Sequence, residues 1–178
     1  MNLDEAKSQA EKYGKTLHNL QLKGDRRSRV ALACFGIAYQ HFSAILILLD
    51  RPNPLNATAF ALLRPLMEAT LRGEWILHCA SDDQVKTFAM GGKKQLDMSS
   101  LIKSLEKCNP ESDAHSVLYK NNWNIVSSYT HTYEHQVQHW LVDGEICPKY
   151  EPEQIAWLIN AATASFRLSV SSIHSLAR

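Results

Sequence analysis

The chain has 178 residues, and its 19 lysines and arginines against 18 aspartates and glutamates give a net charge of +1. This is the length of one ordinary domain, and a chain of this size can bury a hydrophobic core without disulfides or metals. A composition of 45% hydrophobic and 21% charged residues is that of a globular protein and not of a disordered one. The even charge balance excludes a global attraction to nucleic acid, to membranes or to acidic partners, so any electrostatic function must come from a local patch.

The four cysteines lie far apart, and none forms a C-x-x-C pair, which argues against a zinc ribbon or a redox motif. We expect reduced thiols in a cytoplasmic protein: Cys34, Cys79, Cys108 and Cys147. The first 20 residues carry charges and no apolar run, so they do not resemble a signal peptide. Residues 30–49 approach membrane-spanning length, but Gln40, His41 and Ser43 lie inside this stretch, and a buried core helix with no membrane partner is the better interpretation.

Apolar residues recur at helical spacing along most of the chain, and no segment alternates long enough to predict a sheet. The pattern predicts helices over about 3–22, 32–49, 55–79, 82–107, 112–141 and 152–178. Pro65 should kink the third helix or divide it into two stacked pieces, and Gly91-Gly92 should bend or interrupt the fourth. We therefore expect residues 1–178 to form a single all-α domain, an antiparallel up-and-down bundle of about five to seven helices.

The third predicted helix carries a charged strip on an otherwise apolar surface. Arg64, Glu68 and Arg72 fall within one quadrant together with Trp75. Because unpaired buried charges are very costly, the strip must be internally paired or must line a cavity. Two interpretations remain open: a structural network in which Glu68 pairs with both arginines, or a pocket that favours an anion because two guanidinium groups face one carboxylate.

Three histidines follow one another at intervals of four residues. His131, His135 and His139 would share one face of a continuous helix. Two of them could chelate zinc with help from Glu134, although a helix cap, solvated histidines or a phosphate-facing His131 are alternatives. We expect neither a metal ion nor a cofactor on balance.

Two further patterns bear on nucleic acid. Arg72 and His78 have the spacing found in HEPN ribonucleases, where the pair would stabilise a phosphate and move a proton, although Gly73 stands where those enzymes tend to have a polar residue. A basic cluster, Lys23, Arg26, Arg27 and Arg29, could contact a nucleic-acid backbone, but a charged turn between two helices is the favoured interpretation.

Several segments resemble an uncharacterised bacterial all-helical family that is related to HEPN-like bundles. The segments that carry the resemblance are 64–69 with Leu71-Arg72-Gly73 and Trp75, 127–131, Gln136, and 143–146 with Tyr150. The similarity runs from about Ala31 onward and implies a HEPN-like bundle, often dimeric, with a shared polar site at Arg64, Glu68, Arg72, Ser128 and His131. The chain departs from the family pattern at Thr132 and Tyr133, which replace a glycine pair, and at His139, where arginine is common.

Together these patterns suggest a HEPN-like protein that binds or cleaves RNA or a nucleotide through a phosphate-binding pocket. In the catalytic version Arg72 and Arg64 hold the phosphate, His131 or His78 acts as acid or base, Glu68 orients the arginines and Ser128 contributes to ligand binding. The alternative is a non-catalytic homodimeric interaction module in which the Arg64–Glu68–Arg72 strip is structural.

Overall fold

The computed structural model describes residues 1–18, 20–22, 24–92, 96–110, 114–131, 134–142 and 144–177. Within these residues the chain is all-α, as predicted, with nine helices and one pair of two-residue strands, a helix count slightly above the expected five to seven. The elements are α1 (Leu3–Leu17), α2 (Arg26–Leu49), α3 (Asn56–Ala61), α4 (Leu63–His78), α5 (Asp82–Ala89), α6 (Met98–Cys108), α7 (Ala114–Thr130), α8 (Glu134–Gln138), β1 (Leu141–Val142), β2 (Glu145–Ile146) and α9 (Pro152–Ser175).

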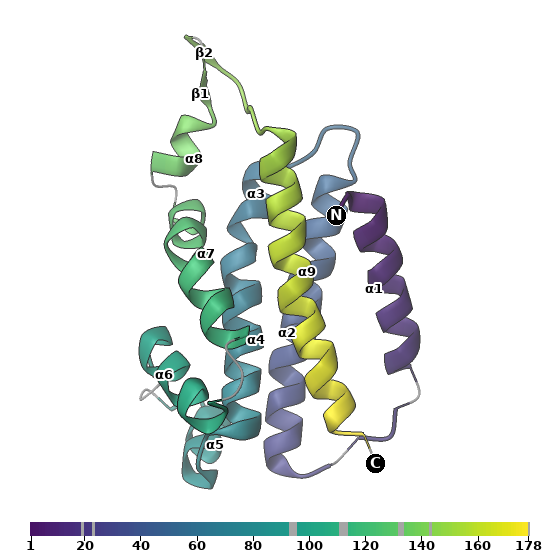
Figure 1. The fold of residues 1–178 in the computed structure, drawn as a ribbon, viewed down its shortest axis with the longest axis vertical. Coiled ribbons are helices and arrows are strands. Elements are labelled where there is room, and N and C mark those ends of the chain that lie inside the picture. The colour runs from purple at the N-terminus through teal and green to yellow at the C-terminus, as the bar shows by residue number, and fades with distance from the viewer. Residues whose placement is uncertain are drawn as a thin grey trace.

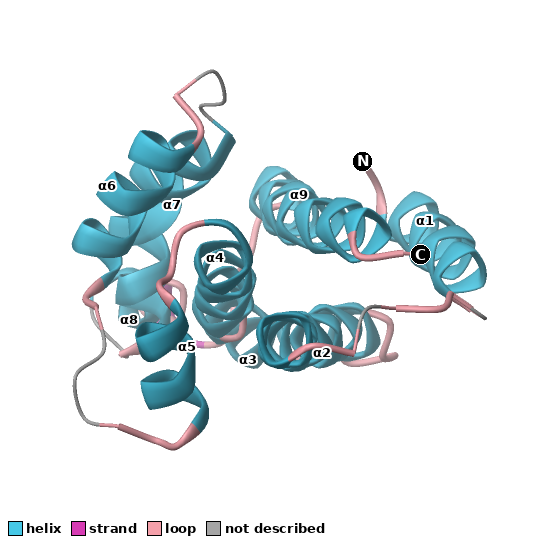
Figure 2. Ribbon diagram, turned by 90° about the horizontal axis from the view of Figure 1, so that it is seen from below, coloured by secondary structure: helices cyan, strands magenta, loops and turns pink. Residues whose placement is uncertain are grey.

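The long helices lie side by side, with α1, α4 and α9 running in one direction and α2 in the other (Figure 1). Helix α2 runs antiparallel to both α4 and α9, and these three helices make the central contacts of the bundle. Helix α1 packs against α9 and α2 on one side, while α5, α6 and α7 lie on the other side, towards α4 (Figure 2). Strands β1 and β2 form a short antiparallel hairpin before α9.

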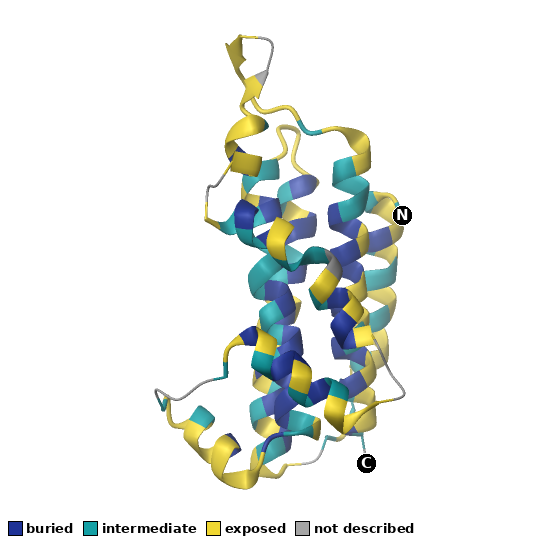
Figure 3. Ribbon diagram, turned by 60° about the vertical axis from the view of Figure 1, so that its left-hand side comes forward, coloured by how far each residue is buried: buried dark blue, intermediate teal, exposed yellow. Residues whose placement is uncertain are grey.

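The core lies where α2, α4 and α9 meet, and the buried residues follow these helices along their length (Figure 3). Phe42 of α2 stacks on Phe166 of α9 with ring centroids 4.4 Å apart. A Cβ at Gly73 of α4 would lie 2.4 Å from the Phe35 ring, so glycine is required for α2 and α4 to approach this closely. This packing explains why the chain has glycine at position 73.

The helix boundaries differ from the predicted ones in ways that have local causes. The third predicted helix is indeed two pieces, α3 and α4, and Pro65 is the third residue of α4, where its missing N–H would have no helical partner in any case. The fourth predicted helix is also two, and Gly91 follows α5 with φ 71°. The first helix ends at Leu17 and not at residue 22, because Leu22 instead pairs with Ala177 in an isolated bridge.

Helix α2 is long and apolar enough to cross a membrane by length and composition, with 39% of the apolar window buried. A single such helix is weak evidence for a membrane span. Its packing against α4 and α9 accounts for the apolar composition in the way expected of a core helix.

Candidate functional site

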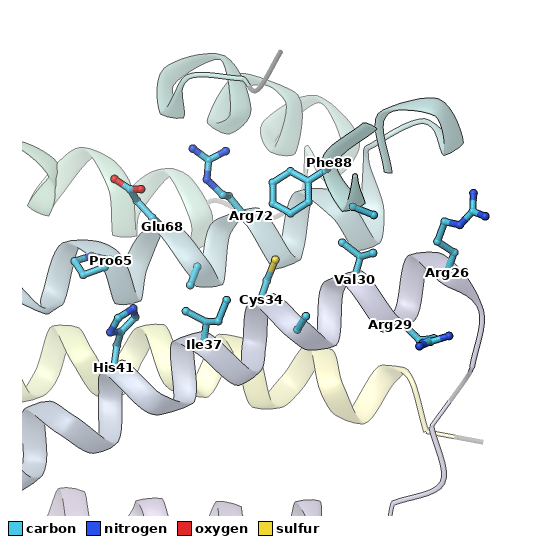
Figure 4. A pocket seen from close by; sticks show the side chains of 13 residues that line it. Arg26, Arg29, Val30, Cys34, Ile37, His41, Pro65, Glu68, Arg72 and Phe88 are labelled. Carbon is cyan, nitrogen blue, oxygen red and sulfur yellow. The ribbon is translucent and has the colours of Figure 1, made fainter. Parts of the chain in front are cut away.

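A cavity of about 860 Å³ lies between α2, α4 and α5 (Figure 4). We call it the α2–α4 cleft. Its apolar lining residues are Val30, Ala33, Cys34, Ile37, Pro65, Ala69, Phe88 and Ala89, and its polar ones are Arg26, Arg29, His41, Glu68 and Arg72.

The cleft is elongated because one face of α2 supplies most of its wall. The lining residues of α2 recur every three or four positions from Arg26 to His41, as residues on one helix face must. Fifteen residues of α-helix span about 22 Å. Helix α4 contributes residues between Pro65 and Arg72, and α5 contributes Phe88. The cleft is therefore long enough for a ligand with separate polar and apolar parts.

The charge of the cleft lining is positive. The lining contains three arginines, Arg26, Arg29 and Arg72, and a single carboxylate, Glu68, which accepts a hydrogen bond from Arg64 Nε at 2.9 Å. Arg72 projects from α4 between Glu68 and Phe88 (Figure 4), and its Nη1 donates to the Leu96 carbonyl at 3.4 Å. Arg26 and Arg29 lie towards the start of α2, at the opposite end of the cleft from Glu68 (Figure 4), so the positive charge is spread along the cleft. This charge favours an anionic ligand, and Arg geometry is suited to phosphate or carboxylate.

Two titratable groups of the cleft are held in their neutral forms. Burial lowers the pKa of His41, so its imidazole is uncharged at neutral pH and can accept a proton. Burial raises the pKa of the Cys34 thiol to about 11, and the nearby Arg72 offsets only part of this effect. Cys34 is therefore a small apolar wall residue and not a nucleophile at neutral pH.

The predicted polar strip does lie on one face of α4, but its members have different neighbours. Arg64 Nη1 donates a hydrogen bond to Nε2 of His131, and the Arg64 guanidinium lies over the Trp123 ring at 4.9 Å from the centroid. The structure therefore brings Arg64, Glu68 and His131 together. Neither Arg64 nor His131 lines the α2–α4 cleft, so Glu68 is the residue that connects this cluster to the cleft.

Arg72 and His78 lie on different sides of α4. Six residues of α-helix place two side chains about 120° apart. Arg72 lines the cleft, whereas Nε2 of His78 lies 3.6 Å from Oε2 of Glu74. The spacing typical of HEPN ribonucleases therefore does not produce a shared pocket among the described residues.

Ser128 does not line the cleft either. Its side chain is buried in α7, and its Oγ has no hydrogen-bond partner within the described part of the chain. Two residues near it that also carry the family resemblance contact α3: Thr130 Oγ1 donates to the Ala61 carbonyl at 3.2 Å, and Gln136 Nε2 donates to the Ala57 carbonyl at 3.0 Å. Tyr150 in turn donates to Oε1 of Gln136 at 2.9 Å. Thr130, Gln136 and Tyr150 therefore have mainly a structural role.

The three spaced histidines do not share one helix face, because α7 ends at Thr130 and α8 begins at Glu134. His131 contacts Arg64, while His139 accepts a hydrogen bond from the Tyr129 hydroxyl at 2.9 Å. Across the residues the structure describes, no group of three or more histidine, cysteine, aspartate or glutamate side chains is placed to hold a metal ion. The zinc interpretation of this segment has no geometric support.

The residues of the basic cluster near the start of α2 make different contacts. Lys23 lies outside the described residues. Arg27 caps the end of α4, donating to the carbonyls of Ile76 and Ala80 at 2.7 and 2.6 Å and pairing with Asp82. Arg26 and Arg29 instead line the cleft, which the interpretation as a plain charged turn missed. The helical spacing from Arg26 and Arg29 through Cys34 to His41 was the available signal for these residues.

Fold and cleft together define an all-α bundle protein with a positively charged cleft. The family of unknown function DUF6988 matches residues 35–177, and the chain belongs to this family. The match includes His41, Glu68 and Arg72 of the cleft, whereas Arg26 and Arg29 precede it. No curated protein and no solved structure matches the chain.

Proposed function

We propose that this protein binds a phosphate-bearing ligand, RNA or a nucleotide, in the α2–α4 cleft. One observation carries the proposal: three arginines line a cavity of about 860 Å³ whose single carboxylate is already paired with Arg64. Arg72 would hold the phosphate by charge-assisted hydrogen bonds, and Arg26 and Arg29, further along the cleft, would attract the negative charge of the ligand. The apolar wall, with Phe88 and Ile37, suits a base or sugar, because nucleobases stack on aromatic rings whatever their sequence.

Cleavage of a phosphodiester is the reaction that this arrangement could support. Arg72 would hold the scissile phosphate, and His41 is the histidine of the cleft, with a lowered pKa that suits a general base. His131 would then act through Arg64 and Glu68 as a positioning residue. His78 contacts Glu74 and stays a weaker catalytic candidate.

The second candidate is a homodimeric interaction module without catalysis. Two observations favour it. Arg64 lies over the Trp123 ring and is bonded to His131. Three large hydrophobic side chains of α2 are exposed, Ile37 at 50%, Tyr39 at 49% and Ile47 at 65%. Exposed apolar side chains on one helix can mark a protein interface. A HEPN-like relationship, a bacterial origin and a cytoplasmic location belong to both proposals. The first two rest on the sequence resemblance, and the third rests on the four cysteines, which we expect to be reduced.

Fluorescence anisotropy with labelled single-stranded RNA and a labelled nucleotide tests the first proposal. Arg29→Ala and Arg72→Ala should each weaken binding about tenfold, a loss of about 1.4 kcal/mol. Arg167→Ala, which removes an exposed arginine from α9, is the matched control and should bind like the wild type. No binding to either ligand, or equal affinity in all four proteins, would contradict the proposal.

The same proteins, with His41→Ala and His131→Ala, are then incubated with a mixed labelled RNA pool, with and without divalent metal. Cleavage lost in Arg72→Ala and His41→Ala, with circular dichroism unchanged, would establish a ribonuclease in this cleft. Binding without cleavage would restrict the function to recognition. A stable dimer that Ile47→Lys dissociates, with no ligand bound, would favour the interaction module.

A further inference from the structure

A second cavity of about 420 Å³ adjoins the α2–α4 cleft, and Arg72 and Phe88 line both. These two side chains therefore separate the α2–α4 cleft from the second cavity. The second cavity also contains Trp75 of α4 and three polar residues of α5, namely Asp83, Gln84 and Thr87. A ligand that reaches past Arg72 would enter surroundings different from those of the cleft.

The second cavity combines hydrogen-bond acceptors with the aromatic rings of Trp75 and Phe88. Asp83 has no ion pair among the described residues, whereas the carboxylate of Asp97, also at this cavity, accepts hydrogen bonds from Ser99 and Ser100 as the cap of α6. The Oε1 of Gln84 accepts from the Ser81 N–H at 2.7 Å, which leaves its amide NH₂ as a donor. The cleft therefore offers cations, and the second cavity offers an available carboxylate beside Trp75.

We propose that the ligand is a single nucleotide that spans both cavities, with its phosphates at Arg72 and its nucleoside in the second cavity. This inference rests on the proposed phosphate-binding function. The base would lie against Trp75 and Phe88, and its N–H donors would meet Asp83. Guanine presents two adjacent N–H donors that one carboxylate can accept together, so a guanine nucleotide should bind best. A cavity of this size lies within the range of small-molecule sites.

Isothermal titration with pyrophosphate, guanosine diphosphate and adenosine diphosphate tests the inference on the full chain. The wild type should bind guanosine diphosphate at least about tenfold more tightly than pyrophosphate, with adenosine diphosphate between them. Asp83→Asn should reduce guanosine diphosphate affinity about tenfold and leave pyrophosphate affinity unchanged, whereas Arg72→Ala should weaken all three ligands.

Asp4→Asn is the matched control, because Asp4 is the second residue of α1 as Asp83 is of α5. Both variants therefore remove one negative charge from the same position of a helix N-terminus. Equal affinities for pyrophosphate and guanosine diphosphate, with no effect of Asp83→Asn, would overturn the inference and leave phosphate binding intact. If none of the three ligands bound, both the nucleotide inference and the proposed phosphate-binding function would be wrong.

Discussion

Glu74 and Ser172 are 98 residues apart in the chain, and the serine hydroxyl donates a hydrogen bond to Oε1 of the glutamate in the core between α4 and α9. The other oxygen of Glu74 lies 3.2 Å from Nε2 of His115 in α7 and 3.6 Å from Nε2 of His78. Glu74 is only 2% exposed, and a carboxylate buried so deeply depends on such partners. It therefore ties three helices together.

Glu74 and Glu68 lie on the same helix, and their variants separate a structural role from a binding role. Glu74→Gln should lower the free energy of unfolding by about 2–4 kcal/mol, because its hydrogen-bonded network is buried. Glu68→Gln should lower it by no more than about 1 kcal/mol, since the Glu68 side chain is 30% exposed and its ion pair is with Arg64. Urea denaturation followed by circular dichroism measures both. If Glu68→Gln lowered the free energy of unfolding as much as Glu74→Gln does, the Arg64–Glu68–Arg72 strip would be a structural network and not part of a binding site.

Gly73 should tolerate no side chain. A Cβ there would lie within 3 Å of three atoms of the Phe35 ring, so Gly73→Ala should destabilise the protein by about 1–3 kcal/mol. Gly36→Ala is the matched control, because Gly36 is also inside a helix but has open space around it. That substitution should stabilise the protein by about 0.5–1 kcal/mol. Melting temperatures that fall equally in both variants would contradict the close approach of α2 and α4.

Alkylation should distinguish the cysteines of the native protein. Burial raises the pKa of Cys34 to about 11, so its thiol stays protonated at pH 8 and should react slowly with iodoacetamide. Cys108 and Cys147 are exposed and should react first. Mass spectrometry of peptides after timed quenching measures the order. Rapid labelling of Cys34 in the folded protein would mean that its thiol is more accessible to solvent than the structure indicates.

His41 should titrate below its ordinary pKa of 6.5, because burial disfavours the imidazolium form. Protonation then opposes folding, so the stability associated with neutral His41 is present above pH 6.5 and is lost as the pH falls below that value. A proton NMR titration measures this pKa directly. A bound phosphate should raise it, because the anion stabilises the imidazolium. A His41 pKa at or above 6.5 in the free protein would refute the burial argument.

Helical periodicity was sufficient to predict the all-α class, the division of the third helix near Pro65 and the shared face of Arg64, Glu68 and Arg72. It could not predict the partners of these residues. The sequence shows the register of one helix, but which helix faces which is decided by long-range packing such as Phe35 against Gly73. For this reason the site was expected at His131, while the histidine of the cleft is His41, on a neighbouring helix.

The structural role of Glu74 could not be predicted from the sequence for a related reason. Glu74 lies two positions from Arg72 among the charged residues of α4, and no local signal distinguishes it from a surface residue. Its partners His115 and Ser172 come from α7 and α9, which only the tertiary structure brings together. Ser127-Ser128-Tyr129-Thr130-His131 carried a recognisable pattern, but the pattern does not separate a structural brace from a ligand site.

The most direct test of phosphate binding in the α2–α4 cleft is its location by NMR. A ¹⁵N-labelled sample is titrated with pyrophosphate, and the backbone amide shifts are mapped on the structure. Binding in the cleft predicts that the largest shifts fall within residues 26–41 and 65–72, and that Arg29→Ala reduces them at equal pyrophosphate concentration. Shifts centred elsewhere, or no shifts at millimolar pyrophosphate, would contradict the proposed site.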